Sequence, residues 1–306
     1  MKKIAFVFPG QGSQSTGMGK DLYDNFDIAK KIFDNACEIT GIDYKKLCFE
    51  GSDEELKITY NTQPAIFITS AAAYFVLKEK NILPSYVAGH SLGEYNALLA
   101  ANVLSFEDAL KIVKYRAELM HQAAEQEKGS MAAIMKISEE ELLEICKSID
   151  ERVQPAAFNS PGQIVVSGPI ESVNKVVSKC KELKYKAIEL KVSGAWHSPL
   201  MKSAEEQLKE LIERVEFKKP EIPVVLNSTA KITDDVTQIK TALINQLTKP
   251  VLWVKTIELL LNEGVELFIE TGPSKVLSGL IQKINKDINV INFSSISDFE
   301  NIEKNV

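Results

Sequence analysis

The sequence Gly89-His90-Ser91-Leu92-Gly93 places a serine between two glycines, directly after a short apolar run. A serine in this setting, between a strand and a helix, is typical of a nucleophile elbow. Glycines are required because the tight turn leaves no room for side chains, and the turn exposes the serine oxygen at the positive end of the following helix. The pattern predicts that Ser91 is a nucleophile; the alternative is a Gly-Ser-Gly turn without chemistry.

A serine nucleophile needs a base, and the chain contains three histidines. His90 adjoins Ser91, and neighbouring side chains at an elbow point apart. His121 lies on a predicted helix with its own core stripe, so we expect it to be solvated or partly buried. His197 lies between a predicted strand and a predicted helix, where a side chain can reach a cleft. A lone histidine is more often structural than catalytic, but elimination leaves His197 as the predicted base.

Arg116 is one of only three arginines among 36 basic residues. It shares one side of a predicted helix with the apolar residues Ala109, Ile112, Met120 and Ala123. A guanidinium in such a stripe needs a carboxylate partner, because an unpaired buried charge is costly. Two partners remain open: a glutamate of the protein, or a substrate carboxylate, which the arginine fork binds with a geometry that lysine lacks.

The glycine-rich run from Gly10 to Ser15 follows the first predicted strand. It is not a dinucleotide-binding fingerprint, because Ser15 stands where the third glycine is required. A loop of this kind can instead present a backbone N–H to an oxyanion.

Strands and helices alternate along most of the chain, which predicts an α/β fold with a parallel sheet covered on both faces. The predicted strands are 3–8, 86–89, 223–227, 266–270 and 290–293, and the predicted helices are 21–40, 65–78 (opened by Pro64), 92–101, 106–126, 200–215 and 254–262.

The segment 129–192 has a different order, strand–helix–strand–strand–helix–strand, which is the ferredoxin-like pattern. We interpret it as a small domain inserted into a large, discontinuous domain formed by 1–128 and 193–306. The cleft between the two is the expected site.

Composition excludes several other functions. A net charge of −6 gives no basic footprint for nucleic acid, and no apolar stretch reaches the length of a membrane span. The apolar run after Met1 is too short for a signal peptide. The four cysteines show neither CxxC pairing nor metal-type spacing with histidine. We expect a soluble cytoplasmic protein with free thiols and without a metal or other cofactor.

With these motifs the chain resembles the malonyl-CoA:acyl-carrier-protein transacylases from end to end. The matching motifs are Phe6-Val7-Phe8-Pro9-Gly10-Gln11-Gly12-Ser13-Gln14, Gly89-His90-Ser91-Leu92-Gly93-Glu94, the Arg116 helix, Gly129-Ser130-Met131-Ala132-Ala133, Asn159-Ser160-Pro161-Gly162-Gln163, Ala195-Trp196-His197-Ser198-Pro199, Gln246-Leu247-Thr248-Lys249-Pro250-Val251 and Glu270-Thr271-Gly272-Pro273.

The resemblance implies a hydrolase-like large domain with a ferredoxin-like insert. It also implies that Ser91 carries a malonyl ester and that His197 acts as base and acid. Backbone N–H groups of Gln11 and Leu92 would form the oxyanion hole, and Arg116 would hold the malonyl carboxylate.

Two further positions follow from the resemblance. The family orients its histidine through a backbone carbonyl near the position of Gln246 rather than through an aspartate, and Gln246 is itself an expected substrate-binding residue. Trp196 stands where malonyl-specific polyketide acyltransferases carry phenylalanine, a departure that bears on specificity. The implied partners are malonyl-CoA and the phosphopantetheine thiol of acyl carrier protein, in a ping-pong transfer that supplies malonyl units for fatty-acid elongation.

Two alternatives from other classes fit the sequence less well. An α/β-hydrolase usually has the order serine, acid, histidine, with the histidine near the chain's end, but no histidine follows His197. A scaffold that only binds acyl-CoA or carrier protein would not need Ser91, His197 and Arg116 together.

Overall fold

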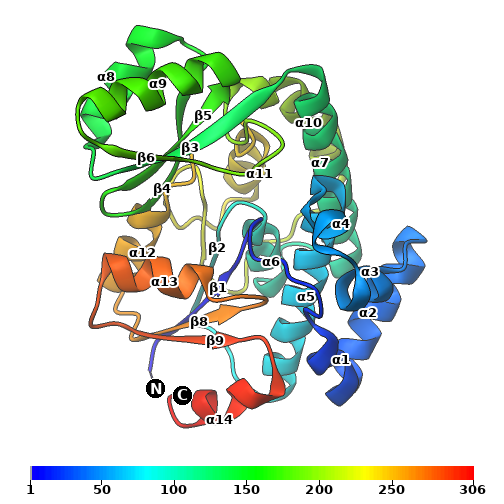
Figure 1. Cartoon of the computed structure of the whole chain (residues 1–306). Coiled ribbons are helices and arrows are strands. Elements are labelled where there is room, and N and C mark those ends of the chain that lie inside the picture. The colour runs from blue at the N-terminus through cyan, green and yellow to red at the C-terminus, as the bar shows by residue number, and fades with distance from the viewer. Residues whose placement is uncertain (1) are drawn as a thin grey trace.

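The computed structural model describes residues 2–306 and contains two sheets that differ in strand direction (Figure 1). All neighbouring strands of the larger sheet are parallel, in the order β7-β2-β1-β8-β9. Its strands are β1 (Ile4–Phe8), β2 (Tyr86–Gly89), β7 (Val224–Val225), β8 (Leu267–Thr271) and β9 (Asn289–Phe293). The predicted parallel core is therefore confirmed.

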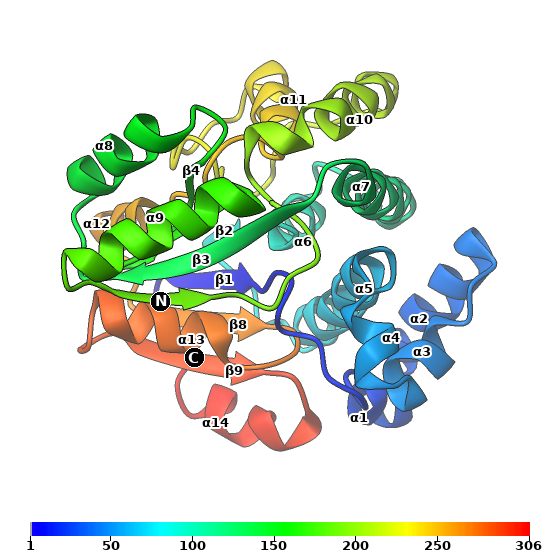
Figure 2. The ribbon, with the colours of Figure 1, turned by 45° about the horizontal axis from the view of Figure 1, so that its top comes forward.

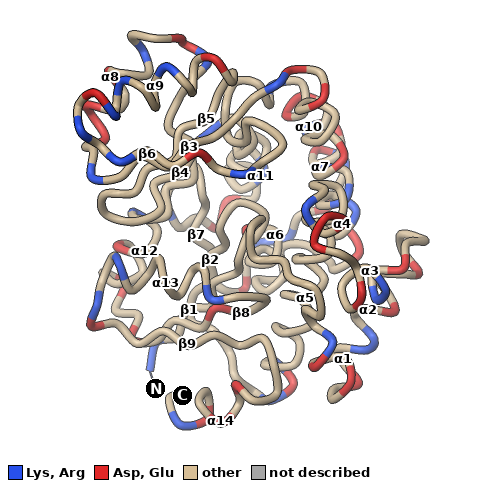
Figure 3. The backbone as a smooth tube through the Cα atoms, viewed as in Figure 1, with Lys and Arg blue, Asp and Glu red and all other residues tan. Residues whose placement is uncertain are grey.

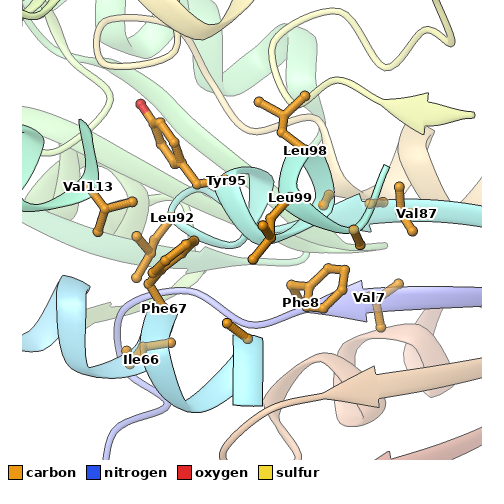
Figure 4. Packing of buried hydrophobic residues seen from close by; sticks show 14 of the residues in the cluster. Val7, Phe8, Ile66, Phe67, Val87, Leu92, Tyr95, Leu98, Leu99 and Val113 are labelled. Atoms are coloured by element: carbon orange, nitrogen blue, oxygen red, sulfur yellow. The ribbon is translucent and has the colours of Figure 1, made fainter. Parts of the chain in front are cut away.

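The strands of the parallel sheet read as apolar runs because helices cover them. Every residue of β1 is buried, and Figure 4 shows Val7 and Phe8 in one apolar cluster with Ile66 and Phe67 of the helix Thr59–Glu79 and with Leu98 and Leu99 of the helix Gly93–Ala100. The helices of this part are α1 (Lys20–Asn25), α2 (Asp27–Thr40), α3 (Tyr44–Glu50), α4 (Asp53–Lys57), α5 (Thr59–Glu79), α6 (Gly93–Ala100), α7 (Phe106–Gln126), α10 (Lys202–Arg214), α11 (Val236–Asn245), α12 (Trp253–Asn262), α13 (Val276–Ile284) and α14 (Phe299–Glu303).

The second sheet is antiparallel, in the order β4-β5-β3-β6, with α8 and α9 on its outer side (Figures 1 and 2). Its elements are β3 (Gly129–Met135), α8 (Glu139–Ile149), β4 (Gln154–Ser160), β5 (Gln163–Pro169), α9 (Ile170–Glu182) and β6 (Lys186–Glu189). This is the expected ferredoxin-like arrangement. Its helices pack a separate apolar cluster that includes Ile134, Leu142 and Val166. The exact domain boundaries at 128/129 and 192/193 stay a prediction.

Two helix predictions were wrong. The predicted helix 21–40 is broken at Phe26, whose extended backbone (φ −131°, ψ 122°) directs its ring against Phe299. Pro64 does not open its helix: α5 begins at Thr59, so the proline lies inside it. The Thr62 hydroxyl donates to the carbonyls of Leu56 and Ile58 and so ties this added turn to α4.

Basic and acidic residues alternate along the outer helices, as the blue and red segments of the backbone show (Figure 3). Within residues 2–306, no helix is both long and apolar enough to cross a bilayer. The same range contains no His, Cys, Asp and Glu group arranged to hold a metal ion, and its four cysteines are unpaired.

Candidate active site

Ser91 lies on a sharp turn between β2 and α6, with a left-handed backbone (φ 51°). The two flanking residues must be glycines because the turn leaves no space for a Cβ atom at either position. A Cβ on Gly89 would lie 1.9 Å from the carbonyl carbon of Gly93, and a Cβ on Gly93 would lie 2.0 Å from the Phe8 oxygen. The predicted strand–turn–helix is thus present, and it exposes the Ser91 hydroxyl above the sheet.

His197 follows the last strand of the small sheet in the sequence, and its side chain lies beside Ser91. Its Nε2 lies 2.7 Å from the Ser91 Oγ, while its Nδ1 lies 2.8 Å from the Gln246 carbonyl oxygen and 3.1 Å from that of Lys249. Carbonyls only accept, so the hydrogen-bond pattern assigns the ring hydrogen to Nδ1. The Nε2 lone pair is then left for the serine hydroxyl.

The surroundings of His197 keep its ring neutral. Burial, and then the positive charge of Arg116, lower its pKa to about 3, against the opposing effect of the carbonyls that accept from Nδ1. A neutral imidazole is the form that can take a proton from a serine.

Neither of the other two histidines is hydrogen-bonded to the Ser91 hydroxyl, although His90 lies close by. The Nε2 of His90 lies 2.8 Å from the Asn159 Oδ1, and its ring packs edge-on against Trp253. His121 is partly exposed and lies 3.6 Å from a carboxylate oxygen of Glu125 on its own helix. The elimination that selected His197 therefore agrees with the geometry.

Arg116 is 1% exposed, and its guanidinium lies beside the serine. Its Nη1 donates to the Gln63 Oε1 at 2.5 Å, and its Nη2 donates to the Gln246 Oε1 at 2.9 Å and to the Ser91 Oγ at 3.2 Å. Every hydrogen-bond partner of this side chain within residues 2–306 is neutral. The internal salt bridge that sequence reasoning left open is absent from that range.

Burial lowers the pKa of Arg116, and the nearby Tyr95 and Glu94 raise it. An arginine nevertheless stays protonated in a protein. The site therefore holds a buried positive charge, next to the nucleophile, with only neutral hydrogen-bond partners.

A cavity of about 230 Å³ opens over the Ser91 hydroxyl between the two sheets. Gln11, Leu92 and Trp196 line it, as do Met131 of β3 and Val165 of β5. Gln246, which the sequence grouped with the substrate-binding residues, does not line it. Its side chain instead lies behind Arg116.

The backbone N–H groups of Gln11 and Leu92 form no hydrogen bond within residues 2–306. Gly10 makes the approach of the first loop possible, because a Cβ there would lie 2.5 Å from the His90 carbonyl oxygen. The two loops thus meet at the same wall of the cavity.

The sequence alone did not identify several polar residues around the site. They are Gln63, which binds Arg116; Glu94, which binds Gln246; Gln154, which binds the His197 carbonyl; and Asn227, which binds the Ser91 N–H. Only Glu94 stood in a recognised motif. Buried amides have no periodicity or characteristic spacing, and their partners here lie far away in the sequence.

Comparison with known proteins agrees with this architecture. Residues 5–298 match the model of the family described as acyl transferase domain. The chain is 46% identical over 307 residues to the malonyl CoA-acyl carrier protein transacylase of Bacillus subtilis (strain 168), covering 99% of this chain and 96% of that protein.

Solved structures are similar over the same length. An acyl carrier protein S-malonyltransferase from Vibrio cholerae O1 biovar eltor str. N16961 superposes with a TM-score of 0.95 at 39% identity, covering 98% of this chain and 99% of that one. A malonyl-transacylase in complex with its type II PKS acyl-carrier protein gives a TM-score of 0.96 at 38% identity, covering 99% and 100%.

Proposed function

The chain belongs to the acyl transferase family and, within it, to the malonyl-CoA:acyl-carrier-protein transacylases, and on this premise we propose that it transfers malonyl from malonyl-CoA to a carrier-protein thiol. The observation that carries the proposal is Arg116. A buried guanidinium with only neutral partners, 3.2 Å from the Ser91 Oγ, calls for an anionic acyl group at the nucleophile. The free carboxylate of a malonyl thioester supplies that charge.

In the first half-reaction, the Ser91 Oγ attacks the thioester carbonyl while its proton passes to the His197 Nε2. The tetrahedral oxyanion would accept hydrogen bonds from the N–H groups of Gln11 and Leu92, which have no other partner in residues 2–306. When the intermediate collapses, His197 returns the proton to the coenzyme A sulfur, and a malonyl-Ser91 ester remains.

The second half-reaction reverses these steps with a new thiol. His197 removes the proton of the carrier-protein phosphopantetheine, and its sulfur attacks the ester. The proton then returns to the Ser91 Oγ as malonyl leaves on the carrier. Coenzyme A and carrier protein present the same phosphopantetheine thiol, so one cavity serves both, and the structure of a relative bound to its carrier protein supports this partner. The product would supply fatty-acid chain elongation.

The experiment that tests the proposal is brief exposure to radiolabelled malonyl-CoA, followed by mass spectrometry of the Ser91 peptide and a chase with holo-acyl carrier protein. We expect a malonyl ester on Ser91 that moves to the carrier. Ser91→Ala should take no label, with transfer reduced on the order of 10⁴-fold or more.

The competing functions give different results in the same experiment. A hydrolase would release malonate without transfer, and a binding scaffold would take no label at all. Either result would overturn the proposal.

A further inference from the structure

Glu94, the second residue of α6, is a carboxylate that the mechanism above does not use. It is 1% exposed and lies behind the elbow. Its Oε1 accepts from the backbone N–H of Asn227 at 2.9 Å, and its Oε2 accepts from the Gln246 Nε2. Burial raises its pKa to about 7, while these donors and the charge of Arg116 oppose the rise.

Gln246 links Glu94 to Arg116 through a side-chain amide whose two ends have opposite polarity. The NH₂ end donates to Glu94 and, at 2.9 Å, to the Ser91 carbonyl oxygen. The oxygen end is thereby turned toward Arg116, from which it accepts at 2.9 Å. Every hydrogen-bonding group of this amide is in use.

A flipped amide would place its NH₂ group against the guanidinium, where both groups are donors. It would also place its oxygen against two acceptors, the Ser91 carbonyl and the Glu94 carboxylate. The Glu94 carboxylate accepts hydrogen bonds at both oxygens, so it permits only the orientation in which the Gln246 NH₂ group faces it. The Asn227 N–H meanwhile fixes the other Glu94 oxygen.

We propose that Glu94 is a positioning residue that locks the Gln246 amide with its oxygen toward Arg116, and so holds the guanidinium where it selects malonyl over uncharged acyl groups. This inference rests on the proposed function and adds to it the origin of the selectivity. Glu94 does not contact the Ser91 hydroxyl. It binds the Gln246 amide and the backbone N–H of Asn227, and its proposed effect on Arg116 passes through Gln246.

Glu94→Gln tests this with an almost unchanged shape. The new amide has one oxygen, and both the Asn227 N–H and the Gln246 NH₂ require an acceptor. If the oxygen serves Asn227, the new NH₂ meets that of Gln246 and forces Gln246 to flip, so that Arg116 loses an acceptor. A buried group left unsatisfied in this way costs roughly a ten- to hundredfold change in kcat/KM.

We therefore expect Glu94→Gln to lower kcat/KM for malonyl-CoA at least tenfold more than for acetyl-CoA, which has no carboxylate. Glu94→Asp, which keeps an acceptor at both oxygens, should keep a malonyl-to-acetyl ratio nearer to wild type. The matched control is Asn96→Leu on the same helix, which removes a buried hydrogen bond to the Phe67 carbonyl with no link to Gln246. It should lower the melting temperature and leave the ratio unchanged.

A readout that needs no transfer completes the test. Sodium malonate should raise the melting temperature of wild type more than sodium acetate at equal ionic strength, and Glu94→Gln should lose this difference. An equal loss with both acyl donors, or an unaltered malonate effect, would show that Glu94 is only structural. A wild-type protein that never forms malonyl-Ser91 would instead contradict the proposed function, and the malonate measurement would still decide the role of Glu94.

Discussion

At the scale of single residues, Arg116 contacts the hydroxyl of Ser91, the proposed nucleophile, and is also the proposed anchor of the acyl carboxylate. Its contacts to Gln63 and Gln246 keep the guanidinium in place while the site is empty. A bidentate bond to a carboxylate adds about 1.5–3 kcal/mol, because the acceptor is charged.

We predict that Arg116→Ala lowers kcat/KM for malonyl-CoA roughly ten- to a hundredfold more than for acetyl-CoA. Steady-state kinetics with both donors measure this. Arg116→Lys is the control: it keeps the charge without the fork, so malonyl transfer should recover only in part. Equal losses with both donors would indicate that Arg116 merely supports the fold.

His197 also gives a prediction for stability against pH. Its pKa is lowered from the ordinary 6.5 to about 3 in the folded protein, so between these values the unfolded chain binds a proton that the folded chain does not. Stability therefore falls as the pH decreases through this window. Glu94, with a raised pKa, acts in the opposite direction between about 7 and 4.5.

Comparison with a variant isolates the contribution of His197, since Glu94 is common to both proteins. We expect the melting temperature of His197→Gln, relative to wild type, to rise steadily as the pH is lowered from 6.5 to 4. Thermal unfolding monitored by circular dichroism at several pH values checks this. A difference independent of pH would mean that the ring titrates normally.

At the scale of elements, strand β4 connects the small sheet to His197, the proposed base. The Gln154 Nε2 donates to the His197 carbonyl at 2.9 Å and to the Thr248 carbonyl at 2.7 Å. His197 has a left-handed backbone (φ 57°), which a non-glycine residue keeps only when its surroundings hold it. The Gln154 side-chain amide thus joins His197 to the segment 246–249, whose carbonyls orient the His197 ring.

We predict that Gln154→Leu lowers kcat about tenfold and leaves KM for malonyl-CoA nearly unchanged, because two partly buried carbonyls lose their donor while the cavity keeps its shape. Gln207→Leu is a suitable control, since that exposed amide donates only to the Ser203 carbonyl of its own helix. A KM effect as large as the kcat effect would place Gln154 in substrate binding instead.

The sequence was informative about elements where a local pattern is sufficient. Short apolar runs located the parallel strands, and the Gly-Ser-Gly pattern located the strand–turn–helix that carries Ser91. The break at Phe26 was missed because it depends on a contact with Phe299, near the far end of the chain. The amide network was missed for the same reason: Asn227 binds the Ser91 N–H across 136 residues. Long-range contacts of this kind leave no trace in local spacing.

At the scale of the whole molecule, the cavity exists only because the two sheets face each other. Strands of the small sheet line it on one side, and the loops after β1 and β2 line it with α5 and α7 on the other. Trp196 lies where the chain returns from the small sheet to the large part. Trp196 is 6% exposed, and its ring packs closely against Gly194, where an added Cβ would lie 2.6 Å from the indole. The indole therefore forms a firm wall of the cavity.

From this wall we predict a strong preference for malonyl-CoA over methylmalonyl-CoA, since forcing an extra methyl group into a packed site costs about 1–3 kcal/mol. Competition between the two donors measures the preference, and Trp196→Ser should reduce it. Equal kcat/KM values in wild type would contradict the idea. An unchanged preference in Trp196→Ser would assign the selectivity to another residue, such as Leu92.

The buried charge of Arg116 beside Ser91 also has a pharmacological consequence. Most serine-directed covalent inhibitors are neutral, and the desolvated cation would give them no attraction. An electrophile that carries a carboxylate at the spacing of a malonyl group would be drawn to the guanidinium before it reacts. Such a warhead would distinguish this enzyme from serine hydrolases whose acyl pockets lack a cation, and that discrimination would come from binding rather than from intrinsic reactivity.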